Sequence, residues 1–241
     1  MIPKIIHYCW FGHGPMPELA LKCIESWHHH MPDYEYKLWD EDSFDVNIVP
    51  YTKEAYEAHK YAFVSDYVRL WALYHEGGVY LDVDFLVYKP FDDLLHWDAF
   101  AGFEGSKHMP LMMGVIASVP KGEWVNEQLE AYDNRRFIKQ DGTCDLTTNV
   151  SFVSSVMRKH GFVQNGMEQN YKDLHVFPVE CFCPRQTTGE YYRTVNTYCE
   201  SKGLGSWSNQ KGTKKWKNEV LRALGLKNRI KLIKLKRKLL G

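Results

Sequence analysis

The chain has 241 residues, of which 44% are hydrophobic and 25% charged, a balance typical of one soluble globular domain with a sizeable core. No apolar run approaches about 18 residues and no signal peptide is recognisable, so we expect neither a membrane-spanning helix nor secretion. The six cysteines show no paired metal-ligand spacing, which excludes a zinc-finger type of site and favours a cytoplasmic protein with reduced thiols.

Charge is segregated along the chain although the formal net charge is zero. Residues 214–241 contain eleven Lys and Arg and one acid, whereas the other 213 residues contain 19 basic and 29 acidic side chains. We therefore expect a catalytic domain at 1–213 and a basic tail at 214–241. Aliphatic residues in the tail give an imperfect amphipathic helix, which favours an anionic membrane surface. Nucleic acid is not expected as a partner because the body is acidic, and a solvated basic end is the alternative.

Hydrophobic periodicity and turn residues predict strands that alternate with helices. Strands are expected at residues 4–10, 34–39, 79–85, 99–103, 111–118 and 176–184, the last one broken by prolines. Helices are expected at residues 19–27, 52–60, 61–74 and 123–134, and from 145 onward with Thr147 or Thr148 as the cap. Asp92 and Asp93 are expected to cap a further helix. This order predicts an α/β fold with a largely parallel sheet, which binds ligands at the carboxyl ends of its strands.

The first expected strand ends at Trp10, directly before a loop that is rich in glycine and proline. A strand that opens a domain in this way commonly delivers its last side chains to a nucleotide site. Trp10 is therefore a candidate to stack on a base, and a position in the hydrophobic core is the alternative.

Asp82 and Asp84 are the strongest candidates for a metal site. They follow a Gly77-Gly78 turn and an apolar strand, and with Tyr80 they are expected on one face of that strand. Two carboxylates this close repel each other and are costly to bury without a cation. Oxygen ligands suit Mg²⁺ or Mn²⁺, with a bound diphosphate supplying further oxygens. An exposed strand end with two solvated acids is the alternative.

Asp66 and Arg69 stand three residues apart, on one face of the helix that precedes this strand. They are expected to point at the strand end and to hydrogen-bond sugar hydroxyls or phosphate. The alternative is a surface ion pair that contributes little to stability.

The segment 61–84 resembles the signature of the family 32 glycosyltransferases. These enzymes of bacterial capsular polysaccharide clusters are related to yeast Golgi mannosyltransferases and clostridial glucosylating toxins. The start of the chain, residues 2–12, is close to the family's opening motif. The positions that carry the signature are Ser65, Asp66, Arg69, Gly77, Gly78, Tyr80, Asp82 and Asp84.

The resemblance implies a GT-A fold and a retaining transfer of a hexose of the galactose or glucose type from a UDP-sugar. It implies that Trp10 lies against uracil, that Tyr80 and Asn149 bind the donor, and that Asp66, Arg69, Asp82 and Asp84 form the catalytic site. Mn²⁺ or Mg²⁺ would be held by the two acids of the motif.

The resemblance weakens near residue 200, where Ser201 and Lys202 replace the two histidines that the family usually carries. Ser206 and Trp207 match the family and are expected at the donor. Either Glu200 or Ser206 completes the metal shell, or Lys202 neutralises the leaving diphosphate as a fixed cation. We expect a retained metal with altered ligands.

The sequence thus predicts a metal-dependent transferase that acts on a glycan acceptor, lipid-linked and on the inner face of the cell membrane, in capsular or surface polysaccharide synthesis. Two alternatives remain. A phosphatase of the haloacid dehalogenase type also places Asp-x-Asp after an apolar strand, but Leu86 stands where that family has Thr or Val. A non-catalytic sugar-nucleotide-binding protein is favoured only by the Ser201-Lys202 segment.

Overall fold

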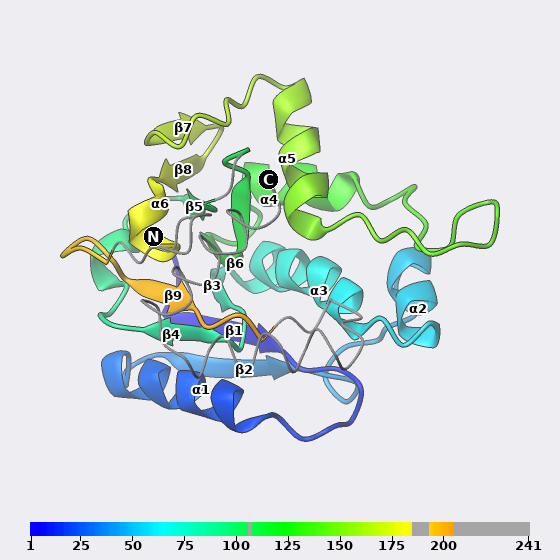
Figure 1. Ribbon diagram of the computed structural model, residues 1–241, viewed down its shortest axis with the longest axis horizontal. Coiled ribbons are helices and arrows are strands. Elements are labelled where there is room, and N and C mark those ends of the chain that lie inside the picture. The colour runs from blue at the N-terminus through cyan, green and yellow to red at the C-terminus, as the bar shows by residue number, and fades with distance from the viewer. Residues whose placement is uncertain (106–107, 185–192, 205–241) are drawn as a thin grey trace, which may run out of the picture.

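The computed structural model of the protein describes residues 1–105, 108–184 and 193–204. Its centre is a seven-stranded sheet in the order β2-β1-β3-β6-β5-β8-β7 (Figure 1). β1 pairs in parallel with β2 and β3, and β5 with β8; β6 is antiparallel to β3 and β5, and β7 to β8. Five of the seven strands therefore run in one direction, which confirms the expected α/β fold with a largely parallel sheet. The strands are β1 (Ile5–Cys9), β2 (Glu35–Trp39), β3 (Gly78–Leu81), β5 (Ala99–Phe103), β6 (Leu111–Ser118), β7 (Gln169–Tyr171) and β8 (Leu174–Phe177).

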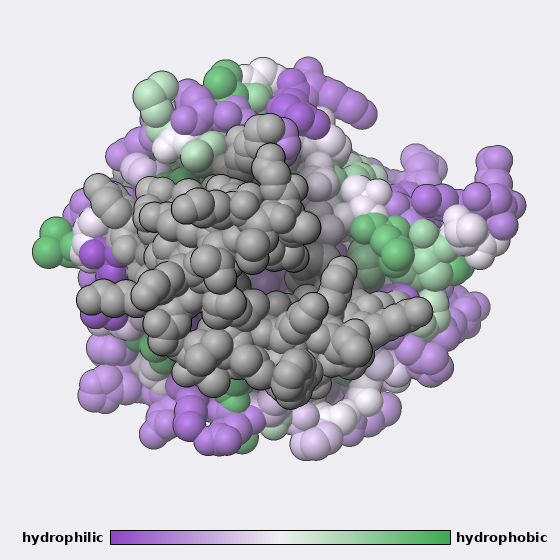
Figure 2. Space-filling view, in the orientation of Figure 1, coloured by the Kyte–Doolittle hydropathy of each residue, from purple (hydrophilic) through white to green (hydrophobic). Residues whose placement is uncertain are grey.

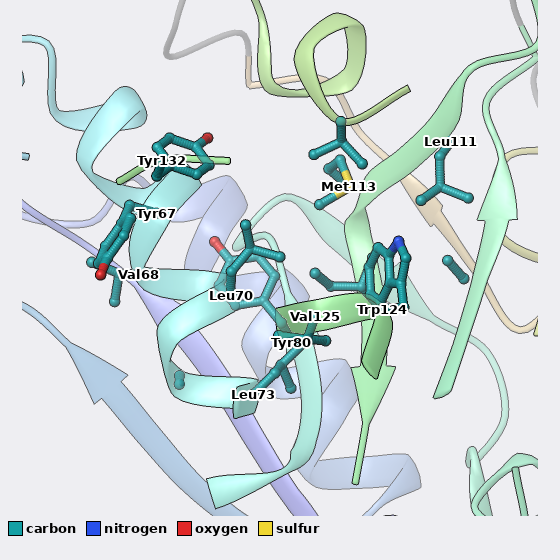
Figure 3. Packing of buried hydrophobic residues seen from close by; sticks show 14 of the residues in the cluster. Tyr67, Val68, Leu70, Leu73, Tyr80, Leu111, Met113, Trp124, Val125 and Tyr132 are labelled. Carbon is teal, nitrogen blue, oxygen red and sulfur yellow. The ribbon is translucent and has the colours of Figure 1, made fainter. Parts of the chain in front are cut away.

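Hydrophobic clusters cover both faces of the sheet because side chains alternate along each strand. Tyr80 points into the first cluster, while Val79 and Leu81 point into the second. Figure 3 shows the first cluster, where Leu73 and Val125 lie close to Tyr80. Helices α2 (Pro50–Glu57), α3 (Tyr61–Glu76), α4 (Glu123–Glu130) and α5 (Asn149–Lys159) cover that face. The other face is covered by α1 (Glu18–His30), the 3-10 turn η1 (Asp92–Leu94) and α6 (Val179–Phe182).

Helix α3 confirms the helix expected from residue 61. It contains neither Gly nor Pro and buries one apolar side, including Val64, Val68 and Leu73. It ends at Glu76 and is capped by Gly77, whose φ of +67° favours glycine, and Gly78 then opens β3 with a φ of +107°. The two glycines thus turn the chain directly from α3 into the centre of the sheet.

The strand expected at residues 79–85 is wrong in its second half. β3 ends at Leu81, residues 82–84 form a turn in which the amide of Phe85 donates to the carbonyl of Asp82 at 3.0 Å, and β4 (Phe85–Val87) belongs to another sheet. There β4 pairs with β9 (Cys199–Ser201) and packs against α1 (Figure 1). Asp82 and Asp84 are therefore brought together by a turn and not by strand alternation.

Smaller differences from the expected elements concern where helices and strands begin and end. α1 continues through His30, α2 stops at Glu57 and does not flow into α3, and residues 176–184 form the end of β8 and the short helix α6. Asp92 and Asp93 do not cap η1, because Asp92 pairs with the Lys4 ammonium at 2.5 Å and Asp93 accepts from Tyr198 at 2.6 Å. Thr148 does cap α5, accepting from the amide of Ser151 at 3.4 Å.

Within the three described ranges, every helix is too short or too polar to cross a bilayer. Figure 2 shows the face seen in Figure 1, and the described residues at its rim are mainly hydrophilic. Ser206, Trp207 and the tail 214–241 lie outside the described residues, so the predictions made for them are neither confirmed nor contradicted.

Gly78→Ala should destabilise the protein by about 3 kcal/mol or more, because strain at positive φ adds to a steric clash. A Cβ there would lie 2.7 Å from the Ile5 carbonyl oxygen and 3.1 Å from His7 Nε2. Gly142→Ala is the matched control, since Gly142 has a φ of +80° but open space around it. It should cost about 1–2 kcal/mol. Urea unfolding measures both, and equal losses would show that the close approach at Gly78 has no effect.

Candidate active site

The site lies where β1 and β3 end side by side. The two strands are parallel neighbours, with Ile6 opposite Val79, so Trp10 and Asp82 leave the sheet at the same edge. Trp10 is half-buried and donates from Nε1 to the Gly14 carbonyl at 2.6 Å. It belongs to neither hydrophobic cluster, so the core position considered as an alternative is not what the structure has.

Arg69 forms the centre of a buried ion network. Its Nη2 lies 2.9 Å from Asp66 Oδ1, and its Nη1 lies 3.4 Å from Asp82 Oδ1. Nη1 also donates to the Met113 carbonyl at 2.6 Å, and the guanidinium carbon lies 4.7 Å from the ring centroid of Tyr80. Asp66 and Arg69 are 9% and 6% exposed. The surface ion pair is therefore ruled out, and losing either partner would leave a buried charge uncompensated.

Tyr80 lies beneath this network and is 1% exposed. Its hydroxyl donates to Asp82 Oδ1 at 2.9 Å, so that Tyr80 and Arg69 hold the same carboxylate oxygen. The structure thus gives Tyr80 a role in positioning Asp82, and its contact with a donor stays a prediction.

The pKa of Asp66 is raised to about 6, chiefly by burial and further by the charge of Asp82. Arg69, Arg135 and the amide of Asn149 act in the opposite direction and favour the carboxylate. Asn149 begins α5, is 5% exposed and accepts from the Tyr132 hydroxyl at 3.4 Å. The structure therefore brings Asn149 beside Asp66, as expected if both contact one sugar.

Asp84 is held by the segment that follows β9. Its Oδ2 accepts from the amide of Leu204 at 2.7 Å and from Ser201 Oγ at 3.3 Å, and the amide of Lys202 donates to its carbonyl at 2.8 Å. Burial raises the pKa of Asp84, and the charge of Asp82 raises it further. An acid with these neighbours binds a cation readily, because the cation removes the cost of ionising it.

Lys202 and Glu200 lie next to Asp84. The Lys202 ammonium forms an ion pair with Glu200, which is 4% exposed, and lies 3.5 Å from the Tyr88 hydroxyl. The positive charge of Lys202 is thus largely balanced by Glu200. Its expected contact with a diphosphate, and that of Glu200 with a metal, stay predictions.

The described residues fit a divalent cation in charge and in ligand type. The ion pairs of this region join Arg69 to Asp66 and Asp82, and Lys202 to Glu200, so that with Asp84 these six side chains carry a charge of −2 when fully ionised. Asp82 accepts its hydrogen bond through Oδ1 and Asp84 through Oδ2, which leaves one oxygen of each for a further ligand. No group of three or more His, Cys, Asp or Glu converges among the described residues. Asp82 and Asp84 would hold the ion, and it would neutralise charge on a diphosphate.

Two neighbours of the site were not foreseen, Met113 and Gly114 in β6. The carbonyl of Met113 binds Arg69, and that of Gly114 accepts from the amide of Asp82 at 2.8 Å. A Cβ on Gly114 would lie 2.4 Å from Phe85 Cε2 and 2.9 Å from Asp82 Oδ2. Only glycine leaves room for the turn there, and the signal was a lone glycine inside an apolar strand.

Asp84→Asn should leave the fold at least as stable as wild type at pH 7. Because the folded pKa of Asp84 is raised, ionising it costs more in the folded than in the unfolded state, and asparagine removes that cost. The gain should vanish as the pH falls and Asp84 becomes protonated. The same variant should lose Mn²⁺ binding in calorimetry, whereas Asp98→Asn, a change at an exposed aspartate, should not. Unchanged Mn²⁺ affinity would contradict the assignment.

Part of the chain resembles known proteins. Residues 17–101 match the family described as "Glycosyltransferase sugar-binding region containing DXD motif". Inositol phosphoceramide mannosyltransferase 3 of Schizosaccharomyces pombe is 32% identical over 137 residues, which cover 50% of this chain and 38% of the relative. Mannosyl phosphorylinositol ceramide synthase CSH1 of Saccharomyces cerevisiae is 32% identical over 167 residues, covering 66% of this chain and 43% of the relative.

This chain thus spans less than half the length of these relatives. Among solved structures, PaToxG Glycosyltransferase shares the fold with a TM-score of 0.51 at 18% identity, over 66% of this chain and 70% of that one. Residues 17–101 therefore match the DXD sugar-binding region of glycosyltransferases, and the chain has a GT-A fold.

Proposed function

We propose that the protein is a glycosyltransferase that moves a hexose from a nucleotide sugar to a hydroxyl group of a glycan acceptor. The observation that carries this proposal is the buried network of Asp66, Arg69 and Asp82 at the ends of β1 and β3, with Asp84 two residues on. Buried charges are costly to maintain, and such networks at strand ends are typical of binding sites.

In this proposal different residues of the site bind different parts of the donor. Asp66, Arg69 and Asn149 bind sugar hydroxyls, Trp10 stacks on the base, and Asp82 and Asp84 face the diphosphate with Mn²⁺ or Mg²⁺. The bond between the anomeric carbon and the diphosphate oxygen breaks, and the acceptor oxygen bonds to that carbon. The acceptor's proton passes to the leaving diphosphate, and the nucleoside diphosphate departs. We propose retention of the α configuration, as the resemblance implies.

The donor has two candidates. A UDP-hexose of the galactose or glucose type is the donor that the sequence resemblance implies. A mannosyl donor is the second, because relatives that share 32% of the aligned residues are named as a mannosyltransferase and a mannosyl phosphorylinositol ceramide synthase.

Incubation with UDP-glucose, UDP-galactose and GDP-mannose should release sugar from one of them, with Mn²⁺ or Mg²⁺ and not with EDTA. Asp84→Asn should abolish the release because it removes one of the two acids that face the diphosphate. Chromatography of the released nucleoside diphosphate gives the rate, and para-nitrophenyl phosphate serves as the substrate for phosphatase activity. Phosphatase activity without sugar release would contradict the proposal, and donor binding without turnover would support a non-catalytic binding protein.

We further propose that the basic tail holds the enzyme on the inner face of the cell membrane, beside a lipid-linked acceptor used in capsular or surface polysaccharide synthesis. Eleven basic residues at 214–241 support this, since each Lys or Arg near an anionic surface contributes on the order of 1 kcal/mol. Nucleic acid is not proposed as a partner.

The full chain should float with phosphatidylserine vesicles and be released by high salt, whereas a chain truncated after Thr213 should not float. The truncated enzyme should hydrolyse the donor at near the normal rate. A full chain with Lys231, Lys234 and Lys238 changed to Gln is the control that keeps the aliphatic residues. Equal flotation of the full and truncated chains would remove the tail from membrane binding.

A further inference from the structure

A second arginine, Arg135, acts electrostatically on Asp66 and has no assigned role. Four buried side-chain N or O atoms lack a hydrogen-bond partner in the described part of the chain, and three of them belong to Tyr51, Arg135 and Asn149. All three residues interact electrostatically with Asp66. The Asn149 amide lies near enough to favour the Asp66 carboxylate, although it makes no hydrogen bond of good geometry.

Aromatic rings enclose the Arg135 guanidinium. Its central carbon lies 4.6 Å from the ring centroid of Tyr51, 5.1 Å from that of Tyr132 and 3.8 Å from that of Phe152. The side chain is only 8% exposed. These contacts come from α2, from α5 and from the segment after α4, so the position of the charge is fixed by three parts of the chain.

Arg135 also holds the segment that leads into Asn149. Its Nη2 donates to Asp145 Oδ2 at 3.0 Å and to the Thr147 carbonyl at 3.4 Å. Asp145 in turn accepts from the amide of Thr147 at 3.0 Å. The next residue caps α5, and Asn149 is the first residue of that helix. The position of Asn149 therefore depends on a segment that Arg135 clamps.

The burial of Arg135 also carries a cost. Nη1 is buried without a hydrogen-bond partner among the described residues, and such a group is costly. An apolar side chain would remove that cost, but it would leave Asp145, whose side chain is 18% exposed, without its ion-pair partner.

We propose that Arg135 is a positioning residue of the donor site, which fixes the segment carrying Asn149 and places a second positive charge beside Asp66. This rests on the proposed function for its effect on catalysis, although its effect on Asp66 can be measured without turnover. The groups that face Asp66 are Arg69 on its own helix, Asp82 from the turn after β3, Arg135 and Tyr132 after α4, Tyr51 on α2 and Asn149 on α5.

The test uses Arg135→Met, the neutral polar variant Arg135→Gln and the charge-keeping variant Arg135→Lys, all in the full chain. Arg136→Met is the matched control, because Arg136 is the next residue, is 63% exposed and pairs with Glu54. Carboxyl ¹³C NMR follows the titration of Asp66, with the signal assigned by its loss in Asp66→Asn. Circular dichroism and the thermal midpoint check the fold.

In Arg135→Met and Arg135→Gln the pKa of Asp66 should rise from about 6 by about one unit, while Arg135→Lys restores most of the difference and Arg136→Met changes nothing. At pH values below the pKa of Asp66, a rise of one unit in that pKa reduces the ionised fraction of Asp66 about tenfold. In these neutral variants donor hydrolysis should fall by up to about tenfold at acid pH and recover toward the wild-type rate above about pH 8.

An unchanged Asp66 titration in a folded neutral variant would overturn the inference, whatever the activity. If Arg135→Met does not fold, the Asp66 titration in Arg135→Gln is the deciding measurement. If the wild type releases sugar from no donor while the Asp66 titration shifts as expected, the charge of Arg135 is confirmed and the proposed function fails. If the wild type is active and neither the titration nor the pH profile changes, the proposed function stands and Arg135 is structural.

Discussion

The guanidinium of Arg69 holds the candidate site together because three separate elements meet on it. It extends from α3, contacts Asp82 in the turn after β3 and donates to a carbonyl of β6. A planar group with several donors in fixed directions can satisfy such partners at once, which an ammonium on a flexible stem cannot do as well. The same side chain therefore fixes the position of α3 against the sheet and the orientation of Asp82.

Two aspartates two residues apart experience different surroundings. Asp82 shares its oxygen with Tyr80 and Arg69 and faces the interior network, whereas Asp84 is held by amides and a hydroxyl from residues 201–204. Burial disfavours the ionised form of Asp84, and the neighbouring charge adds to this. A cation bound beside Asp84 would therefore offset the cost of ionising it.

The sequence predicted those parts of the site in which neighbouring residues act together. The Asp66–Arg69 pair follows from helical spacing, and the position of Trp10 and Asp82 at one edge follows from parallel strands. The turn at 82–84 was missed because its cause is distant, in the glycine of β6 on which Phe85 packs. Arg135 was missed for the same reason, since aromatic enclosure by Tyr51 and Phe152 has no local pattern.

The pairing of β4 with β9 joins residues more than a hundred positions apart, and the backbone and side chain of Asp84 are held by that late segment. Contacts of such long sequence separation form slowly, because a large loop must close before they contribute. During synthesis the β1–β3 edge of the sheet can assemble while Asp84 still lacks its amide partners. The β1–β3 edge would then exist before Asp84 is held in place by residues 201–204.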